Sequence, residues 1–342
     1  MKRLDSYWQT RNPVALTLLP LSWLFCASAV VRRLAYGRGW LRMHRLPVPV
    51  IVVGNITVGG TGKTPLVIRL VAILRSLGLR PGVVSRGYGG RVGQGPPRRV
   101  TPESDPGEVG DEPVLIARRC GVPVWVSPRR AEAGRALLAH SDCDVLICDD
   151  GLQHYALARD LEIAVMDGRG AGNGLCLPAG PLREPLGRLG AVDLRVLNGG
   201  DGEDGALRMQ LHPGQAVSLR HPDRAMPLAA FAGQRVHALA GIGHPARFFA
   251  TLREAGVEPI EHPFPDHHAY SPADIRFGDG CAVLMTEKDA VKCGPFAGSE
   301  HWAVPVDAQL EAAFERRLGD LLGGSTLGQT TARHSGMPDL QG

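Results

Sequence analysis

The residues best suited to chemistry lie in one glycine-rich stretch, GNITVGGTGKTP, at positions 54–65. An apolar run of β-branched residues, 50–53, precedes this stretch, and apolar residues at helical spacing follow it to about residue 77. This order predicts a buried strand, a phosphate-binding loop and a helix. In such a loop, backbone N–H groups and the N-terminus of the helix bind phosphate oxygens.

Several residues of this loop are expected to bind a nucleotide: Gly59, Gly60, Thr61, Gly62, Lys63, Thr64 and Pro65. Lys63 would reach the β- and γ-phosphates, and the Thr64 hydroxyl would hold Mg²⁺. The loop departs from the G-x-x-x-x-G-K-[ST] pattern because Thr57 stands where the first glycine belongs. A glycine-rich turn without a ligand is the alternative, and the flanking strand and helix favour the nucleotide site.

Carboxylates accompany two further apolar segments. Asp111 stands at the start of an apolar helix, where it is either an N-cap or a functional carboxylate. Asp149 and Asp150 end an apolar strand that begins at residue 144. P-loop enzymes use such strand ends to hold Mg²⁺ beside the phosphates, so we predict that both aspartates join Thr64 in a metal site. An acidic strand end that faces solvent is the alternative.

Two loops supply further candidate residues. Arg86 is the first residue after a second predicted strand, 80–85. The irregular connection 168–184 ends with Arg183 and Glu184. Loops this long inside a compact domain commonly serve a site, and an arginine there suits a phosphate group. Because parallel strands end at one edge of the sheet, we expect these loops to meet at the nucleotide.

Strands and helices alternate from residue 49 to 167, which predicts an α/β fold of the P-loop NTPase type. The expected architecture is a doubly wound, mostly parallel sheet, with a second, smaller α/β domain built from elements that begin at Arg235 and end with a last strand, 302–306. We divide the chain into an N-terminal membrane-associated helical segment, 1–45, a P-loop domain, 46–205, a smaller C-terminal α/β domain, 206–322, and a disordered tail, 323–342.

Other segments carry weaker signals. Residues 91–109 are rich in glycine, proline and charge and are expected to form a loop. Residues 199–205 are expected to be a flexible acidic hinge, and two short strands near 206–211 and 215–219 to form a ribbon.

Residues 13–31 are uncharged and lie between arginines on both sides. Pro20 interrupts this segment, and the symmetric positive charge gives no orientation for a membrane-spanning helix. A signal peptide and a buried core helix are alternatives. We favour a helix that docks on a membrane surface, with Trp23 and Trp40 at interfacial depth and the arginines on lipid phosphates.

Composition limits the partners and the compartment. The formal net charge is +4 with no run of five basic residues, and aromatic residues make up 5%, which argues against nucleic acid binding. An acidic substrate or an anionic membrane stays compatible with this charge. The seven cysteines are scattered without a CxxC pair, as expected of reduced thiols in the cytosol. No obligate protein partner is evident.

Taken together in order, a set of motifs covers nearly all of the chain: VGNITVGGTGKTP, SRGYGG, VGDEP, DDGLQH, PLREP, GIGHPARFF, FPDHHAYS and TEKDAVK. By these motifs the chain resembles the tetraacyldisaccharide 4'-kinase family of Gram-negative bacteria. The loop of that family also lacks the glycine that Thr57 replaces. The resemblance implies ATP-dependent phosphorylation, with Mg²⁺, of the 4'-hydroxyl of a tetraacylated glucosamine disaccharide 1-phosphate to give lipid IVA. It places the protein at the cytoplasmic face of the inner membrane.

The same resemblance assigns roles to residues. It makes Asp111 the base that receives the hydroxyl proton, with His267 of the second domain as its partner. It places Asp149, Asp150, Gln153 and His154 in the metal and active-site segment, and Arg183 and Glu184 in the substrate loop. We predict five substrate residues, Gln153, His154, Arg183, Glu184 and, as a cation for developing charge, Arg86. It also places the stretch from Thr286 to Lys292 near the base of ATP.

The glycine-rich loop is also compatible with a protein of another class. A membrane-associated P-loop ATPase could act as a partner switch, with no small-molecule acceptor. Its ATP turnover would depend on a partner and would not need Asp111 or His267. A nucleotide-binding protein without catalysis is a third reading, and the carboxylates at the strand ends disfavour it.

Overall fold

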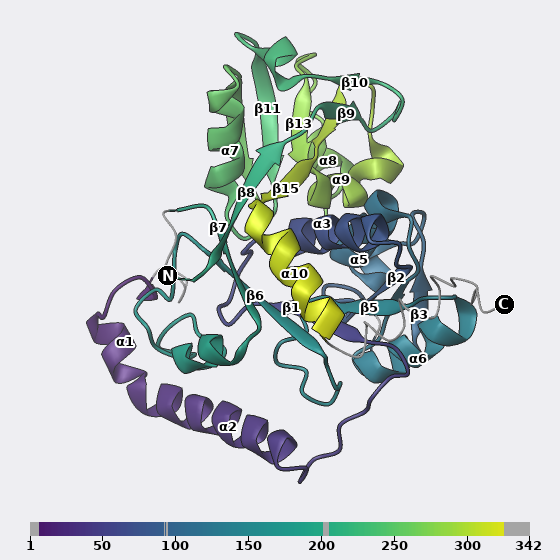
Figure 1. The fold of residues 1–342 in the computed structure, drawn as a ribbon. Helices are drawn as coiled ribbons and strands as arrows, with labels where there is room; N and C mark the ends of the chain where they lie inside the picture. The colour runs from purple at the N-terminus through teal and green to yellow at the C-terminus, as the bar shows by residue number, and fades with distance from the viewer. Residues whose placement is uncertain (1–6, 92, 94, 201–204, 325–342) are drawn as a thin grey trace, which may run out of the picture.

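Two sheets organise the protein in a computed structural model that describes residues 7–91, 93, 95–200 and 205–324 (Figure 1). The larger sheet has nine strands. In spatial order they are β15 (Val306–Leu310), β8 (Leu207–Pro213), β7 (Leu194–Asn198), β6 (Leu161–Asp167), β1 (Val50–Gly54), β5 (Val145–Cys148), β2 (Pro81–Ser85), β4 (Val124–Val126) and β3 (Arg98–Val100).

The pairings in this sheet are parallel from β8 to β4 and antiparallel at the two edges, β15 with β8 and β3 with β4. Helices α3 (Lys63–Ser76), α5 (Asp111–Cys120) and α10 (Ala312–Gly324) cover one face, and α6 (Arg130–His140) covers the other. The predicted doubly wound, mostly parallel sheet is therefore confirmed. The central strands are buried along their whole length, because helices lie on both of their faces.

The smaller sheet has six strands, in the order β10 (Ala225–Met226), β9 (Ala216–Ser218), β14 (His301–Val304), β13 (Val283–Thr286), β11 (Arg235–Ala240) and β12 (Glu258–Pro263). Helix α7 (Pro245–Glu254) packs on one apolar cluster of this sheet, and α8 (Pro272–Ile275) and α9 (Glu287–Cys293) pack on another. Short 3₁₀ helices also occur, η2 (Leu186–Ala191), η3 (Leu228–Phe231) and η4 (Gly294–Phe296) among them.

Prolines mark both places where the chain passes between the sheets. Strand β8 ends at Pro213 in the large sheet and β9 begins at Ala216 in the small one, so the predicted ribbon of these two strands is wrong. The predicted last strand, 302–306, is likewise split, with Pro305 between β14 and β15. Proline has no N–H for a ladder, which explains the break at this position.

Strands β8 and β15 lie within 206–322 and yet pair in the large sheet, so the two sheets do not divide the chain at residue 206. The division into domains stays a prediction. Residues 91–109 are not only a loop, because β3 and the single-turn helix α4 (Pro106–Val109) form there. The expected acidic hinge and tail lie largely outside the described residues.

At the N-terminus, α1 (Pro13–Thr17) and α2 (Leu19–Gly37) lie along the large domain, opposite the small sheet (Figure 1). The break falls at Leu18, which places Pro20 in the first turn of α2, where proline is tolerated. The buried Ser22 hydroxyl donates to the Cys176 carbonyl at 2.7 Å and holds α2 on the body of the protein. Among the helices that the structure describes, none is long and apolar enough to cross a membrane.

Candidate active site

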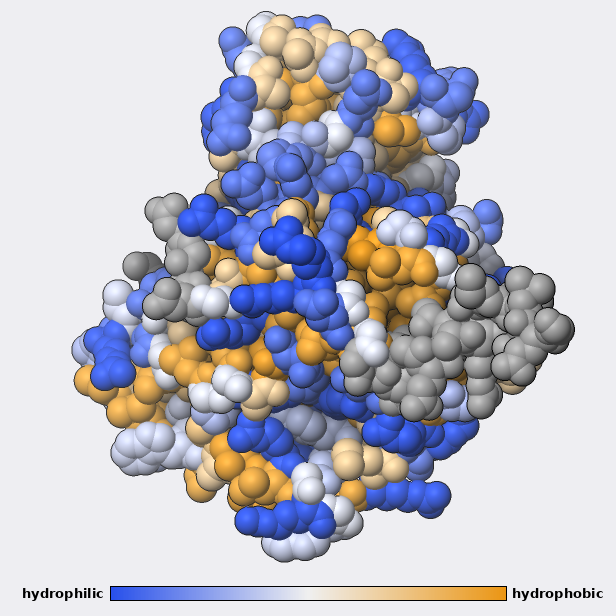
Figure 2. Space-filling view, in the orientation of Figure 1, coloured by the Kyte–Doolittle hydropathy of each residue, from blue (hydrophilic) through white to orange (hydrophobic). Residues whose placement is uncertain are grey.

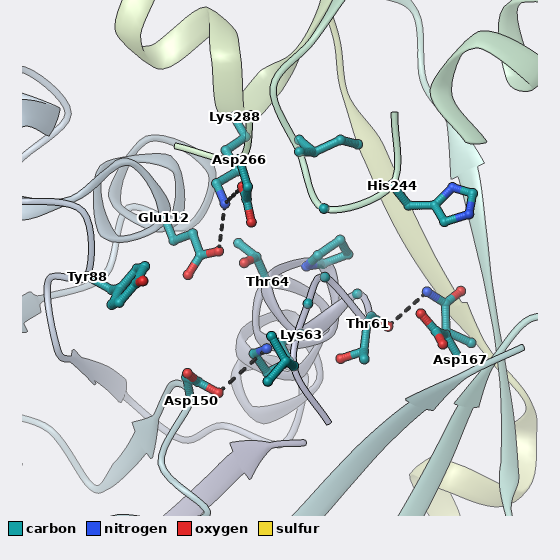
Figure 3. A pocket seen from close by; sticks show the side chains of 18 of the residues that line it. Thr61, Lys63, Thr64, Tyr88, Glu112, Asp150, Asp167, His244, Asp266 and Lys288 are labelled. Carbon is teal, nitrogen blue, oxygen red and sulfur yellow. Dashed lines mark hydrogen bonds and ion pairs between the residues drawn. The ribbon is translucent and has the colours of Figure 1, made fainter. Parts of the chain in front are cut away.

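A cleft of about 1510 Å³ opens where loops of both sheets meet α2. From the large sheet it receives the loop between β1 and α3, the turn after β2 and the strand end of β5. From the small sheet it receives the loops after β11 and β12 and the start of α9 (Figure 3). The volume exceeds that of a typical single-ligand pocket, so a nucleotide and a second large substrate fit together.

All seven predicted nucleotide-binding residues, 59–65, line this cleft. Gly62 has φ of 93°, and a Cβ atom there would lie 2.5 Å from the Asn198 amide nitrogen, so only glycine fits. The same Asn198 nitrogen donates to the Thr61 carbonyl at 3.0 Å (Figure 3). A Cβ on Gly243 of the small sheet would lie 2.7 Å from the Gly60 nitrogen, which brings the two loops into direct contact.

Asp150 faces the P-loop lysine across the cleft. Its Oδ1 lies 3.5 Å from Lys63 Nζ, and Arg183 Nη1 lies 3.2 Å from its Oδ2. Burial works against its charge, but Lys63 and Arg183 outweigh burial and hold the pKa of Asp150 below its usual value. Asp150 is therefore a carboxylate in the cleft, and its φ of 46° is unusual for a residue other than glycine.

Asp149 has a different environment. It is fully buried and does not line the cleft, and its Oδ1 has no hydrogen-bond partner among the described residues. Burial, together with the charges of Glu112 and Asp150, raises the pKa of Asp149 to about 7. A divalent cation would supply the missing partner of this oxygen, so the donor set of Thr64, Asp149 and Asp150 fits Mg²⁺.

Asp111 and His267 form a pair across the two sheets, which we call the dyad. Asp111 is the first residue of α5, and His267 lies in the loop after β12. His267 Nδ1 is 3.1 Å from both carboxylate oxygens of Asp111. The N-cap of α5 is Gly110, so the N-cap reading of Asp111 is wrong. A Cβ on Gly89 would lie 3.1 Å from His267 Nδ1, which explains a glycine in the SRGYGG motif.

The dyad stabilises its own charges. Burial opposes the ionisation of Asp111, but the hydrogen bond from His267 and the charge of Lys288 lower the pKa of Asp111 below its ordinary value. Burial likewise opposes the protonation of His267, and the hydrogen bond with Asp111 outweighs it and raises the pKa of His267. An ionised carboxylate with an aligned imidazole is an arrangement that accepts a proton from a hydroxyl.

A family model described as Tetraacyldisaccharide-1-P 4'-kinase matches residues 14–323. The chain is 53% identical over 321 residues to the tetraacyldisaccharide 4'-kinase of Alkalilimnicola ehrlichii, an alignment that covers 93% of this chain and 96% of that protein. It is 52% identical over 318 residues to the enzyme of the same name from Nitrosococcus oceani, with 92% and 93% covered. The chain belongs to the tetraacyldisaccharide-1-P 4'-kinase family.

A solved structure of this kinase family has the same fold. The crystal structure of LpxK from Aquifex aeolicus in complex with ATP matches with a TM-score of 0.75 and 30% sequence identity. The match covers 90% of this chain and 99% of the Aquifex chain. The predicted family and fold class are therefore confirmed.

All five residues predicted to bind the kinase substrate line the cleft: Arg86, Gln153, His154, Arg183 and Glu184. Glu184 is nevertheless 3% exposed, and its carboxylate accepts hydrogen bonds from Tyr155 at 2.5 Å and from Gln153 at 3.4 Å. Glu184 therefore orients its neighbours. Burial and the surrounding arginines lower the pKa of His154 to about 3, so its imidazole is neutral.

Several charged residues of the cleft were not predicted individually as site residues, among them Glu112, Arg130 and Lys288. Arg130 follows β4 at the carboxyl edge of the sheet, a position that was available as a signal. It is 6% exposed, and its Nε has no hydrogen-bond partner among the described residues. Lys288 lies in the stretch 286–292 that the resemblance places near ATP, but that stretch does not indicate its partner Glu112, which is 176 residues away in the sequence.

Proposed function

We propose that the protein transfers the γ-phosphate of ATP to the 4'-hydroxyl of a tetraacylated glucosamine disaccharide 1-phosphate and so forms lipid IVA. The dyad carries this proposal, because His267 lines the same cleft as the P-loop and its imidazole contacts the ionised carboxylate of Asp111 directly behind it. Family membership supports the same acceptor, which is named in the family description and in the names of the relatives.

The nucleotide side uses the P-loop. Lys63 and the backbone N–H groups of the loop would hold the β- and γ-phosphates. Thr64, Asp149 and Asp150 would hold Mg²⁺, which when bound neutralises charge on the transferring phosphoryl group. Lys63 and Arg183 now face Asp150, and the phosphates of ATP would compete for both cations.

Asp111 is the base in this proposal. The sugar hydroxyl donates its proton to an Asp111 oxygen as the new P–O bond forms, and His267 Nδ1 holds the carboxylate in place. The position of the base matters because phosphoryl transfer is accelerated mainly by alignment of the reacting groups and by cations that stabilise the developing charge.

The acceptor side is cationic. Several arginines surround the neutral His154 closely enough to lower its pKa: Arg130, Arg159, Arg32 and Arg86. Three of them, Arg32, Arg86 and Arg130, also line the cleft. Guanidinium groups bind phosphate well, and the buried Nε of Arg130 has no hydrogen-bond partner within the described ranges of the chain. This cluster suits the 1-phosphate of the acceptor.

The acyl chains require a membrane surface. Several large apolar side chains of α1 and α2 are exposed: Leu16, Leu21, Trp23, Leu24, Phe25, Val31 and Leu34. In Figure 2 apolar residues alternate with hydrophilic ones at the lower left, where these helices lie. Helix α2 also lines the cleft, through Phe25, Ser28, Ala29 and Arg32. We propose that α2 docks on the cytoplasmic face of the inner membrane and that the acyl chains reach the cleft along it.

The partner-switch ATPase is the competing function. It requires no acceptor in the cleft and gives Asp111 and His267 no role. The two functions differ in where the γ-phosphate goes, which is to a lipid for the kinase and to water for the switch.

Transfer of labelled γ-phosphate tests the proposal directly. The protein in detergent micelles is given ATP, Mg²⁺ and the tetraacyl disaccharide 1-phosphate, and label is followed in lipid and in free phosphate. We expect label in the lipid, and a loss of about 10²–10⁴-fold for Asp111→Ala. Asp223→Ala, at an exposed position of the small domain, is the matched control and keeps the wild-type rate. Label that goes only to water would contradict the kinase function.

A further inference from the structure

Lys288 occupies a singular position beside the dyad. It belongs to α9 of the small sheet, and its side chain is 15% exposed and reaches into the cleft. Its ammonium nitrogen lies 3.0 Å from Glu112 Oε1 and 3.0 Å from Asp266 Oδ1 (Figure 3). The same nitrogen lies 3.5 Å from His267 Nε2.

The two carboxylates that Lys288 joins are the sequence neighbours of the dyad. Glu112 follows Asp111 on α5, and Asp266 precedes His267 in the loop after β12. One ammonium group therefore lies between the two chain segments that meet in the dyad. Without it, two carboxylate oxygens that now share one nitrogen would face each other in a half-buried site, and their repulsion would separate the segments.

The ammonium group keeps its charge in this site. Burial opposes that charge, but the surrounding carboxylates raise the pKa of Lys288 above its ordinary value. Three N–H donors on one nitrogen can serve both carboxylates, and a lysine has no acceptor that would compete. The contact with His267 also places a positive charge beside Nε2, the ring nitrogen that points away from Asp111.

On the basis of the kinase function proposed above, we propose that Lys288 is a positioning residue for phosphoryl transfer. Its ammonium group joins the two carboxylates that flank the dyad and holds the dyad together across the two sheets. The resemblance places the stretch 286–292 near the base of ATP, but the Lys288 ammonium group is held by Glu112 and Asp266 beside the dyad. Its removal should therefore change the chemical step and leave ATP binding in place.

The charges around the dyad make this role measurable as a pH profile. His267 is faced by Asp111 from α5, by Lys288 from α9, by Asp266 from its own loop and by the edge of the Tyr88 ring at a centroid distance of 5.0 Å. Behind Asp111, Lys292 lies at 3.6 Å. Loss of the Lys288 charge favours protonation of both dyad members, so the acidic limb of the rate profile should move to higher pH.

The test compares variants of Lys288 in the γ-phosphate transfer assay. For Lys288→Met we expect kcat to fall about 100-fold at neutral pH, a KM for ATP within about threefold of wild type, and an acidic limb shifted upward. Lys288→Arg keeps the charge and should restore most of the rate and the original limb. ATP binding, followed by fluorescence anisotropy of a labelled nucleotide, reports whether each variant is folded.

Arg119→Met is the matched control. Arg119 joins the same two helices, because its guanidinium lies 2.7 Å from Glu287 of α9, yet it does not line the cleft. Loss of this pair weakens the same interface without touching the charges of the dyad, so kcat should stay within about threefold of wild type and the limb should not move.

A second variant covers the case in which Lys288→Met does not fold. Asp266→Asn removes a negative charge beside His267, so the acidic limb should move to lower pH, opposite to the shift for Lys288→Met. The inference is overturned if these limbs stay in place, if only the KM for ATP changes, or if Arg119→Met matches Lys288→Met. A wild-type protein that labels no lipid contradicts the proposed function itself, whereas active wild type with indifferent variants contradicts this inference alone.

Discussion

Asp111 and Asp149 are two buried carboxylates of one active-site region, and their pKa values move in opposite directions. Both are almost fully removed from water, at 3% and 0% exposed. Burial favours the neutral acid in each case. The pKa of Asp111 nevertheless falls below its ordinary value, whereas that of Asp149 rises to about 7.

The neighbours explain the difference. Asp111 lies against the imidazole of His267 and the ammonium group of Lys292, and the nearby charge of Lys288 also favours its ionised form. All three come from α9 and from the loop after β12. Asp149 lies near Glu112 and Asp150, and its Oδ1 has no hydrogen-bond partner in the part of the chain that the structure describes. The protein's own cationic groups thus keep the proposed base ionised. Around the proposed metal ligand such groups do not outweigh burial, and its charge would be balanced by the cation that binds with the nucleotide.

The largest expected effect is on the base. Asp111→Asn keeps the shape of the side chain but cannot take a proton, so the rate of lipid phosphorylation should fall about 10²–10⁴-fold. Affinity for ATP should stay within about threefold, because Asp111 lies outside the P-loop. Single-turnover transfer and nucleotide titration measure the two quantities. If the variant lost ATP affinity to the same extent as it lost rate, Asp111 would contribute to nucleotide binding and would not be the base.

A smaller effect is expected at the metal side. Asp149→Asn removes a buried anionic oxygen, so the Mg²⁺ concentration for half-maximal rate should rise by about 10–100-fold. The rate at saturating Mg²⁺ should recover in large part, which separates this variant from Asp111→Asn. The matched control is Asp167→Asn, since Asp167 lines the same cleft but is paired with Arg169 at 2.6 Å. An unchanged Mg²⁺ requirement in Asp149→Asn would remove Asp149 from the metal site.

The large domain was readable from the sequence because its signals are local. The strand, loop and helix around the P-loop follow one another within 50–76, and the alternation of apolar strands with helices gives a parallel sheet. The ribbon of β8 and β9 was predicted wrongly for the opposite reason. Two neighbouring strands usually pair, and here each belongs to a different sheet, which local periodicity does not record.

The same limit applies to the site. The P-loop residues were found from spacing, whereas the partnership of Asp111 with His267 entered through the family resemblance and spans 156 residues of sequence. The place of Lys288 beside the dyad was not predicted, because its partners come from two distant segments. Burial of Asp149 could be read from its apolar strand, but the missing hydrogen-bond partner of Oδ1 could not, since it depends on packing between strands.

The smallest expected effect is on the stability of the protein without Mg²⁺ or nucleotide. The pH dependence of that stability should differ between variants of Asp149 and of Asp111. The pKa of Asp149 is raised from 3.8 to about 7 in the folded protein, so between these values the unfolded chain ionises while the native protein keeps its proton. Stability is therefore lost as the pH rises through this window, and Asp149→Asn escapes that loss. Its melting temperature, relative to wild type, should rise by about 2 °C or more between about pH 4.5 and about pH 6.5.

Asp111 has a lowered pKa, so its contribution to stability is present above the ordinary pKa of an aspartate and is lost only at more acidic pH. The melting temperature of Asp111→Asn should accordingly keep a constant deficit across the same interval. Calorimetry of both variants and wild type at the two pH values measures these differences, and parallel pH responses of the two variants would show that the carboxylates do not differ as the structure indicates.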